Sequence, residues 1–191
     1  MKINFTLILL VLSFYFAGCS SSGSSNDVYL DSRDGQSYRT IQIGNLIWML
    51  DNLNYKNKGS SCYDDINADC NTYGKLYTWE AAQDAVPQGW RLPTLSELKS
   101  LIEYFKAESK PDILTVDYPR GFNVLYGGSK YYYGEYHGIG EYAVFWSSTE
   151  SDSAKVYCFS LDKEGNNRIT YPDYLKTAGF SVRCIKKASF Y

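Results

Sequence analysis

The chain has 191 residues, a usual length for one domain with a sizeable hydrophobic core. Its 19 basic and 21 acidic side chains nearly cancel, and the formal net charge is −2 at pH 7. A protein that binds nucleic acid through its phosphates needs a basic patch, and this sequence has none. We therefore expect no nucleic-acid partner.

The first residues have the pattern of a secretory signal. Met1-Lys2 is followed by a mostly apolar run over residues 3–16, which is too short to be assigned as a membrane-spanning helix. The block Phe16-Ala17-Gly18-Cys19 resembles the lipobox of bacterial lipoproteins. This resemblance implies cleavage before Cys19 and modification of that residue with fatty acyl chains such as palmitate. Ser20, rather than Asp, follows the cysteine, which by the same resemblance favours the outer membrane or cell surface. The alternative is an ordinary cleaved signal peptide with an incidental cysteine.

These features divide the chain into three parts. Residues 1–18 are predicted to be a lipoprotein signal peptide, residues 19–27 a flexible tether and residues 28–187 a single domain. The tether is rich in Ser, Gly and Asn, and random-coil scaling gives it a reach of about 15 Å.

The cysteines support an exported location. With Cys19 set aside, four remain, and an even number in an oxidising compartment indicates two disulfides. Three pairings are open. We favour Cys62–Cys70, which is local, and Cys158–Cys184, which joins two strand-like segments. The alternative is metal ligation, but a Cys-x7-Cys spacing is not typical of zinc sites and only His137 could assist, so no metal or cofactor is predicted.

The first half of the domain combines a hairpin with two helices. Alternating residues 38–43 and the more apolar residues 46–50 are separated by the turn Gly44-Asn45, which predicts a β-hairpin. A polar loop over residues 56–72 then carries Cys62 and Cys70. Thr78 is a suitable cap for a short helix over residues 79–85.

The second helix has a stronger start signal. Thr94 and Glu97 have the spacing of a capping box, in which each side chain bonds the main-chain N–H of the other residue. The apolar residues that follow recur at helical spacing and predict one buried face, made of Leu98, Leu101, Ile102 and Phe105.

The second half of the domain is predicted to be mostly strand. The expected strands are residues 122–126, 130–133, 141–147, 155–161, 168–171 and 180–186. Because the helices come early and the strands late, the pattern indicates an α+β fold with a largely antiparallel sheet.

Six blocks of sequence carry a family resemblance. They are Asp34-Gly35-Gln36-x-Tyr38, Ile43-Gly44-Asn45-x-x-Trp48-Met49-x-Asp51-Asn52-Leu53, Tyr73-Gly74-x-Leu76-Tyr77-x-Trp79, Gly89-Trp90-Arg91-Leu92-Pro93-Thr94, Phe145-Trp146-Ser147-Ser148-Thr149-Glu150 and Gly179-Phe180-Ser181-Val182-Arg183-Cys184. In this order they resemble the Fibrobacter succinogenes major paralogous domain over nearly all of the mature chain. Two of the blocks are also similar to the C-type-lectin-like architecture of formylglycine-generating-type proteins. The resemblance implies a twisted antiparallel sheet with two flanking helices and adjacent chain ends.

The sequence departs from the family pattern at one cysteine. Members often have a cysteine before the Pro-x-Gly-Trp turn that is expected to pair with the cysteine of the last strand. Val86 occupies that position here. The pairing of Cys158 with Cys184 is therefore a prediction of this sequence and is not transferred from the family.

The sequence offers few groups for catalysis or for calcium binding. His137 is the only histidine, and Ser147 and Ser148 lack the Gly-x-Ser-x-Gly context of hydrolases. Paired cysteines would leave no thiolate for formylglycine-generating chemistry. The calcium-ligand triplets of sugar-binding lectins are also missing, and residues 171–173 are only a partial match. We therefore expect a protein that is not an enzyme.

Tyrosine is the most unusual feature of the composition, with 19 residues. Flat amphipathic rings on a loop-rich surface suit sugar faces or peptide partners, because they supply contact area at little entropic cost. The predicted ligand-binding residues are Tyr131, Tyr133, Tyr136, His137, Tyr142 and Glu150. The alternative is that these rings pack within and over a sheet, and the four tryptophans are expected in the core.

Three functions remain open at this point. The first is a lipid-anchored outer-membrane or cell-surface protein that is not an enzyme and binds a glycan or a surface protein. The second is a structural or accessory surface protein without a small ligand. The third is a degenerate enzyme of the formylglycine-generating type.

Overall fold

The computed structural model describes residues 27–107, 122–163 and 168–189. The predicted signal peptide, Cys19 and nearly all of the predicted tether lie outside these ranges. Asp27, the last residue of the predicted tether, is the first residue of a strand.

A four-stranded antiparallel sheet contains the first and last described strands. Its order is β1-β2-β3-β12, and its strands are β1 (Asp27–Leu30), β2 (Ser37–Ile43), β3 (Leu46–Met49) and β12 (Ile185–Lys187). Strands β2 and β3 form the predicted hairpin, and Gly44 turns it with a φ of +61°. Strand β1 was not predicted from the sequence.

A six-stranded sheet forms the other half of the molecule. Its path is β10-β9-β8-β6-β7, with β11 paired to β9. The strands are β6 (Gly127–Lys130), β7 (Tyr136–Ile139), β8 (Tyr142–Glu150), β9 (Lys155–Asp162), β10 (Arg168–Thr170) and β11 (Asp173–Leu175). The pairing is antiparallel except between β6 and β8, which run parallel. A two-stranded ladder joins β4 (Ser60–Ser61) to β5 (Leu76–Tyr77).

Within the described ranges there are three α-helices and one 3₁₀ turn. They are η1 (Tyr63–Asp65), α1 (Asn67–Tyr73), α2 (Trp79–Ala85) and α3 (Leu95–Ala107). The fold is therefore α+β and rich in strands, as predicted. It differs from the expected pair of flanking helices, because η1 and α1 occupy a segment that the sequence pattern assigned to a polar loop.

The capping box of α3 is present. The Thr94 main-chain N–H donates to Glu97 Oε2 at 2.8 Å, and the Glu97 N–H donates to Thr94 Oγ1 at 3.2 Å. The predicted apolar face is buried, because Leu98, Leu101, Ile102 and Phe105 are each at most 3 % exposed. Helix α3 contacts β8 and β9 through this face.

The core consists of two apolar clusters, and each contains tryptophan. Trp79, Trp90 and Trp146 belong to one cluster and Trp48 to the other. Two indole N–H groups bond main-chain carbonyls: Trp79 donates to Ser147 O at 3.0 Å and Trp146 donates to Tyr77 O at 2.7 Å. The prediction that the tryptophans are core residues is confirmed.

The structure corrects the second predicted disulfide. Cys62 and Cys70 are bonded, but Cys158 and Cys184 are free and buried thiols. Cys158 lies within β9 of the six-stranded sheet, whereas Cys184 directly precedes β12 of the four-stranded sheet. Sequence position had suggested two pairing strands, but the two segments are in different sheets.

A second correction concerns the segment before β6. Residues 122–126 were expected to be a strand, yet the strand begins at Gly127. The guanidinium of Arg183, which is only 2 % exposed, donates instead to the carbonyls of Phe122 and Asn123, and its Nε donates to Asn52 Oδ1 at 2.9 Å. A side chain therefore satisfies carbonyls that a neighbouring strand would otherwise bond.

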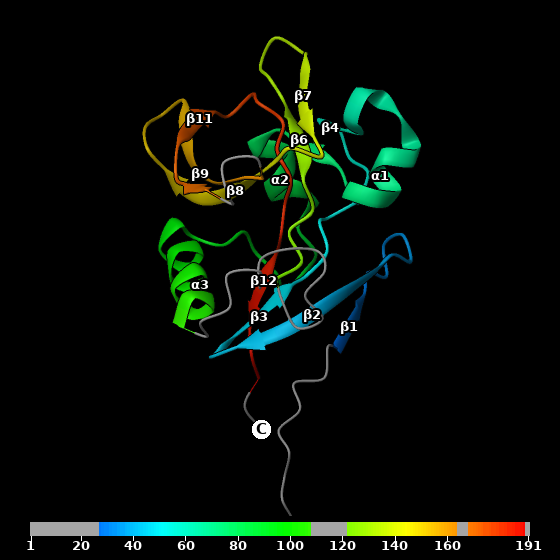
Figure 1. Ribbon diagram of the computed structural model, residues 1–191. Helices are drawn as coiled ribbons and strands as arrows, with labels where there is room; N and C mark the ends of the chain where they lie inside the picture. The colour runs from blue at the N-terminus through cyan, green and yellow to red at the C-terminus, as the bar shows by residue number, and fades with distance from the viewer. Residues whose placement is uncertain (1–26, 108–121, 164–167, 190–191) are drawn as a thin grey trace, which may run out of the picture.

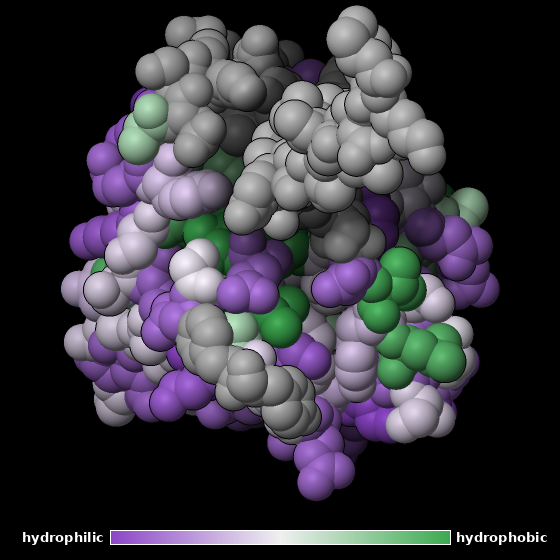
Figure 2. Space-filling view, turned by 90° about the horizontal axis from the view of Figure 1, so that it is seen from below, coloured by the Kyte–Doolittle hydropathy of each residue, from purple (hydrophilic) through white to green (hydrophobic). Residues whose placement is uncertain are grey.

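The two sheets lie at opposite ends of the molecule in Figure 1, with β1, β2, β3 and β12 in the lower part and β7, β9 and β11 in the upper part. Seen from below in Figure 2, the coloured surface is mostly hydrophilic with hydrophobic residues in scattered groups. Among the described residues, no helix combines the length and apolar character needed to cross a membrane.

Candidate functional site

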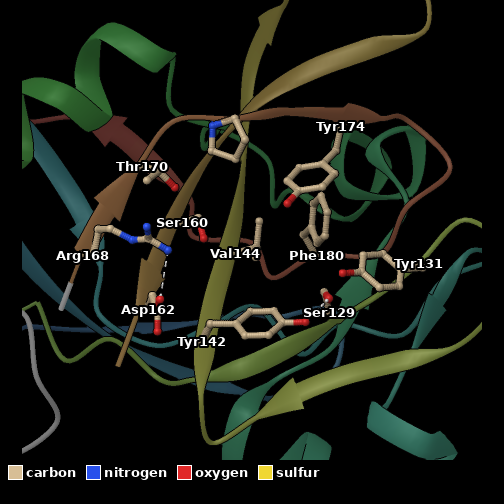
Figure 3. A pocket seen from close by; sticks show the side chains of 11 residues that line it. Ser129, Tyr131, Tyr142, Val144, Ser160, Asp162, Arg168, Thr170, Tyr174 and Phe180 are labelled. Carbon is tan, nitrogen blue, oxygen red and sulfur yellow. Dashed lines mark hydrogen bonds and ion pairs between the residues drawn. The ribbon is translucent and has the colours of Figure 1, made fainter. Parts of the chain in front are cut away.

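A concave pocket lies on one face of the six-stranded sheet, the face opposite α3 (Figure 3). Its volume is about 320 Å³. The lining residues come from β6, β8, β9, β10 and β11 and from the segments beside them: Ser129, Tyr131, Tyr142, Val144, Ser160, Asp162, Arg168, Thr170, Pro172, Tyr174 and Phe180.

Strand alternation explains how the sheet serves both the core and the pocket. Side chains at positions i and i+2 of a strand share one face. Tyr142 and Val144 of β8 face the pocket, while the intervening Ala143 belongs to the cluster under α3. The same division holds in β9 and β10, whose pocket residues are Ser160, Asp162, Arg168 and Thr170 and whose core residues are Phe159, Leu161 and Ile169.

Aromatic rings form one side of the pocket. The rings of Tyr174 and Phe180 meet edge to face, with centroids 5.0 Å apart. Tyr142 places its hydroxyl 3.2 Å from Ser129 Oγ, and burial raises the pKa of Tyr142 to about 12. In Figure 3 the hydroxyls of Tyr131, Tyr142 and Tyr174 all point towards the space between them. Burial also raises the pKa of Tyr174, so the phenols of Tyr142 and Tyr174 are protonated at neutral pH and can both donate and accept hydrogen bonds.

Charged and hydroxyl groups form the opposite side. Arg168 Nη2 lies 3.3 Å from Asp162 Oδ2, a long contact between the ends of adjacent strands. Ser160 and Thr170 add two hydroxyls to the same wall. The pocket thus combines aromatic faces with a carboxylate, a guanidinium and several hydroxyls, a set that can bind a small polar ligand with an apolar face.

Tyr131 and Tyr142 are the predicted residues that the structure brings to the pocket. Tyr131 follows β6 in a turn, so the strand predicted over residues 130–133 ends at Lys130. The rings of Tyr133 and His137 lie tilted against the ring of Tyr131, with centroids 5.4 Å and 4.4 Å from it. They support the rim of the pocket but do not line it.

The other two predicted residues lie elsewhere. The Tyr136 hydroxyl donates to Asp65 Oδ1 at 3.0 Å and accepts from Lys130 Nζ at 2.9 Å, which holds it against η1. Glu150 is at the far end of β8, where it pairs with Lys176 Nζ at 2.6 Å. Neither lines this pocket.

Close packing fixes the position of Tyr142. A Cβ at Gly138 would lie 1.9 Å from the Tyr142 ring, and Gly138 has a φ of +71°. Glycine is therefore required for two reasons: the backbone conformation and the contact with the ring.

Several pocket residues were not predicted. Tyr174 and Phe180 are separated from Tyr131 by more than forty positions in the sequence, and Arg168 and Asp162 read as ordinary charges beside a polar turn. Their convergence depends on the pairing of β9 with both β10 and β11. The alternation of polar residues at 160, 162, 168 and 170 was the available signal.

The described residues contain no group of three or more His, Cys, Asp and Glu side chains arranged to hold a metal ion. The absence of a metal and of a cofactor remains a prediction.

The fold and the pocket define a class: a strand-rich α+β domain with an aromatic and polar concavity on one sheet. The family model of the Fibrobacter succinogenes major domain matches residues 41–186, and the chain belongs to this family. A comparison with curated proteins found no match.

Proposed function

We propose that this protein is a lipid-anchored envelope or surface protein, without catalytic activity, whose sheet pocket binds a saccharide. The observation that carries the proposal is the convergence of three tyrosine hydroxyls and the Asp162–Arg168 pair on one concavity. The C-type-lectin-like architecture implied by the sequence resemblance forms part of the same proposal.

The pocket matches the two chemical surfaces of a sugar ring. One face of a pyranose presents C–H groups, which pack against partly exposed aromatic rings such as Tyr174 and Tyr131. Its rim presents hydroxyls, which donate to the carboxylate of Asp162 and accept from the guanidinium of Arg168. A volume of about 320 Å³ suits one sugar unit at the low end of small-ligand sites.

The wall is pre-organised for binding. Tyr174 is held by the edge contact with Phe180, Tyr142 by its close approach to Gly138, and Tyr131 by the tilted ring of His137. Side chains already fixed in place lose little conformational entropy when a ligand binds, which favours affinity.

A glycan array followed by titration calorimetry tests the binding site. The mature protein should bind a subset of glycans, and Tyr174→Ala should weaken binding at least tenfold because it removes one aromatic contact and leaves the wall open. The matched control is Tyr132→Ala, whose ring is 63 % exposed and lies outside the pocket. Circular dichroism checks that both variants fold.

Two outcomes would contradict the saccharide proposal. One is equal affinity of the wild type and Tyr174→Ala for every bound glycan. The other is that no glycan on the array binds while envelope proteins co-purify with the protein, which would favour the structural or accessory role.

The lipid anchor has its own test. Intact-mass analysis of protein from the membrane fraction should show cleavage before Cys19 and the added mass of acyl chains. Cys19→Ser should shift the protein to the soluble envelope fraction. An unacylated chain that keeps residues 1–18 would refute the anchor while leaving the pocket untouched.

A further inference from the structure

The Cys62–Cys70 disulfide has a lysine ammonium against both of its sulfurs. Lys75 Nζ lies 3.3 Å from Cys62 Sγ and 3.1 Å from Cys70 Sγ. Divalent sulfur is a weak acceptor. Among the described residues, no carboxylate lies within ion-pair distance of the Lys75 ammonium, whose side-chain contacts are with these two sulfurs.

The surroundings make this charge unfavourable while the disulfide is intact. Burial lowers the pKa of Lys75, and the nearby charge of Lys56 lowers it further. A neutral disulfide offers no compensating negative charge. Reduction would place thiolates at the same two positions, about 3 Å from the ammonium, where the attraction between opposite charges is strong. The ammonium therefore stabilises the reduced pair more than the oxidised pair.

A small molecule has a route to one sulfur. Cys70 and Lys75 line a cavity of about 330 Å³, together with Tyr55 and Asn71. This cavity is separate from the sheet pocket, and the two share no lining residue. A thiol that enters it meets the disulfide beside the ammonium.

The helix that carries Cys70 depends on the disulfide. Cys70 is the only buried residue of α1, and η1 has no buried residue. Apart from the covalent link, η1 is held by the contact of the Tyr63 ring with that of Tyr136, whose centroids lie 5.3 Å apart, whereas α1 buries no residue besides Cys70. Breaking the bond is therefore expected to loosen α1.

We propose that Cys62–Cys70 is a redox-active disulfide, reduced by thiol or dithiol donors, with the Lys75 ammonium holding the thiolate that is released. A donor thiolate attacks Cys70 Sγ and forms a mixed disulfide, and the electron pair of the broken S–S bond goes to Cys62 Sγ beside Lys75. A second donor thiolate then attacks the donor sulfur of the mixed disulfide. The two donor sulfurs become joined in a disulfide, which is the oxidised donor, and Cys70 Sγ is released as a second thiolate. Two donor thiols are oxidised and two protein cysteines are reduced.

The test is an equilibrium titration of the mature protein in glutathione redox buffers at pH 7. Alkylation of the thiols and peptide mass spectrometry report the fraction of Cys62 and Cys70 that is reduced, separately from Cys158 and Cys184. Lys75→Met should lower the equilibrium constant for reduction at least tenfold, which for a two-electron couple is about 30 mV. Lys75→Arg, which keeps the charge, should stay within threefold of the wild type. The control is Lys58→Met, an exposed lysine of the same loop, which should leave the constant unchanged.

A second measurement on the wild type removes any dependence on the folding of the variant. After reduction, the rate of alkylation against pH should give at least one of the two thiols a pKa well below the ordinary value of about 8.5. Hydrogen exchange of α1 should also become faster in the reduced protein. The proposal is overturned if Lys75→Met matches the wild type, or if both reduced thiols titrate at the ordinary value. Neither result would bear on saccharide binding at the sheet pocket.

Discussion

Replacing Glu97 with Gln should destabilise the protein at neutral pH and much less in acid. Glu97 accepts two bonds from the Arg91 guanidinium, at 2.8 Å and 2.6 Å, and two from Thr94, whose main-chain N–H and hydroxyl lie 2.8 Å and 2.9 Å away. The bonds from Arg91, with those from Thr94, lower the pKa of Glu97 to about 2. The amide of Gln keeps the shape of this side chain but loses the charge that strengthens all four bonds.

The magnitude follows from the pKa. A carboxyl group whose pKa falls from 4.5 to about 2 contributes at most about 3 kcal/mol to the free energy of unfolding, at 1.36 kcal/mol per pKa unit. The Glu97 side chain is 24 % exposed, and screening by water reduces the contribution to about 1.5 kcal/mol. For a domain of this size, that corresponds to a fall in Tm of about 3–6 °C at pH 7.

The pH dependence gives the decisive measurement. Because the folded-state pKa is depressed, the stabilisation is complete above the unfolded-state pKa near 4.5 and is lost as the pH falls from there towards 2. Thermal unfolding followed by circular dichroism should show the difference between the wild type and Glu97→Gln shrinking by more than half between pH 7 and pH 3. Glu103→Gln is the matched control on the same helix, since its side chain is 70 % exposed and water screens its ion pair with Lys106, so we expect little loss of stability at either pH. An equal loss of stability at both pH values would refute the reasoning.

Three further predictions concern the pocket, the free thiols and the buried arginine. Gly138→Ala should cost about 2 kcal/mol in urea unfolding, because its methyl group would collide with the Tyr142 ring at a positive φ, and it should also weaken saccharide binding. Burial raises the pKa of the Cys158 and Cys184 thiols, so an aromatic disulfide reagent should label neither thiol in the folded protein and both after unfolding without reductant. If no thiol is labelled after unfolding, Cys158 and Cys184 form a disulfide after all. Arg183→Met should lower the free energy of unfolding by about 3 kcal/mol or more, because it removes the buried guanidinium bonds to two main-chain carbonyls and a side-chain amide oxygen; a loss below about 1 kcal/mol would show that water replaces the guanidinium.

Local signals predicted the helices whose ends are fixed by side chains close in sequence. Helix α2 has the predicted bounds because Thr78 caps it and Pro87 follows it, and α3 begins where the capping box indicated. Helix α1 gave no such signal. Its only buried residue is a cysteine, so it has no apolar periodicity to detect.

Features that depend on distant residues could not be predicted. The segment after residue 121 resembles a strand in its apolar pattern, but Arg183, some sixty positions later, bonds its carbonyls. The assignment of Cys158 and Cys184 to different sheets likewise depends on strand pairing. Composition identified Tyr131 and Tyr142 as candidates for contact, whereas Tyr174 joins them only because β11 pairs with β9.

The separation of the two sheets has a consequence for how the protein would stand on a bilayer. Strand β1 begins at Asp27, only a few residues after the proposed acylated Cys19, and its sheet occupies the end of the molecule away from β11 in Figure 1. A flexible tether with a reach of about 15 Å would keep that end of the domain near the lipid headgroups. The end with the proposed saccharide pocket would then project outward by the length of the whole domain, so that long polymers could bind there without contacting the membrane.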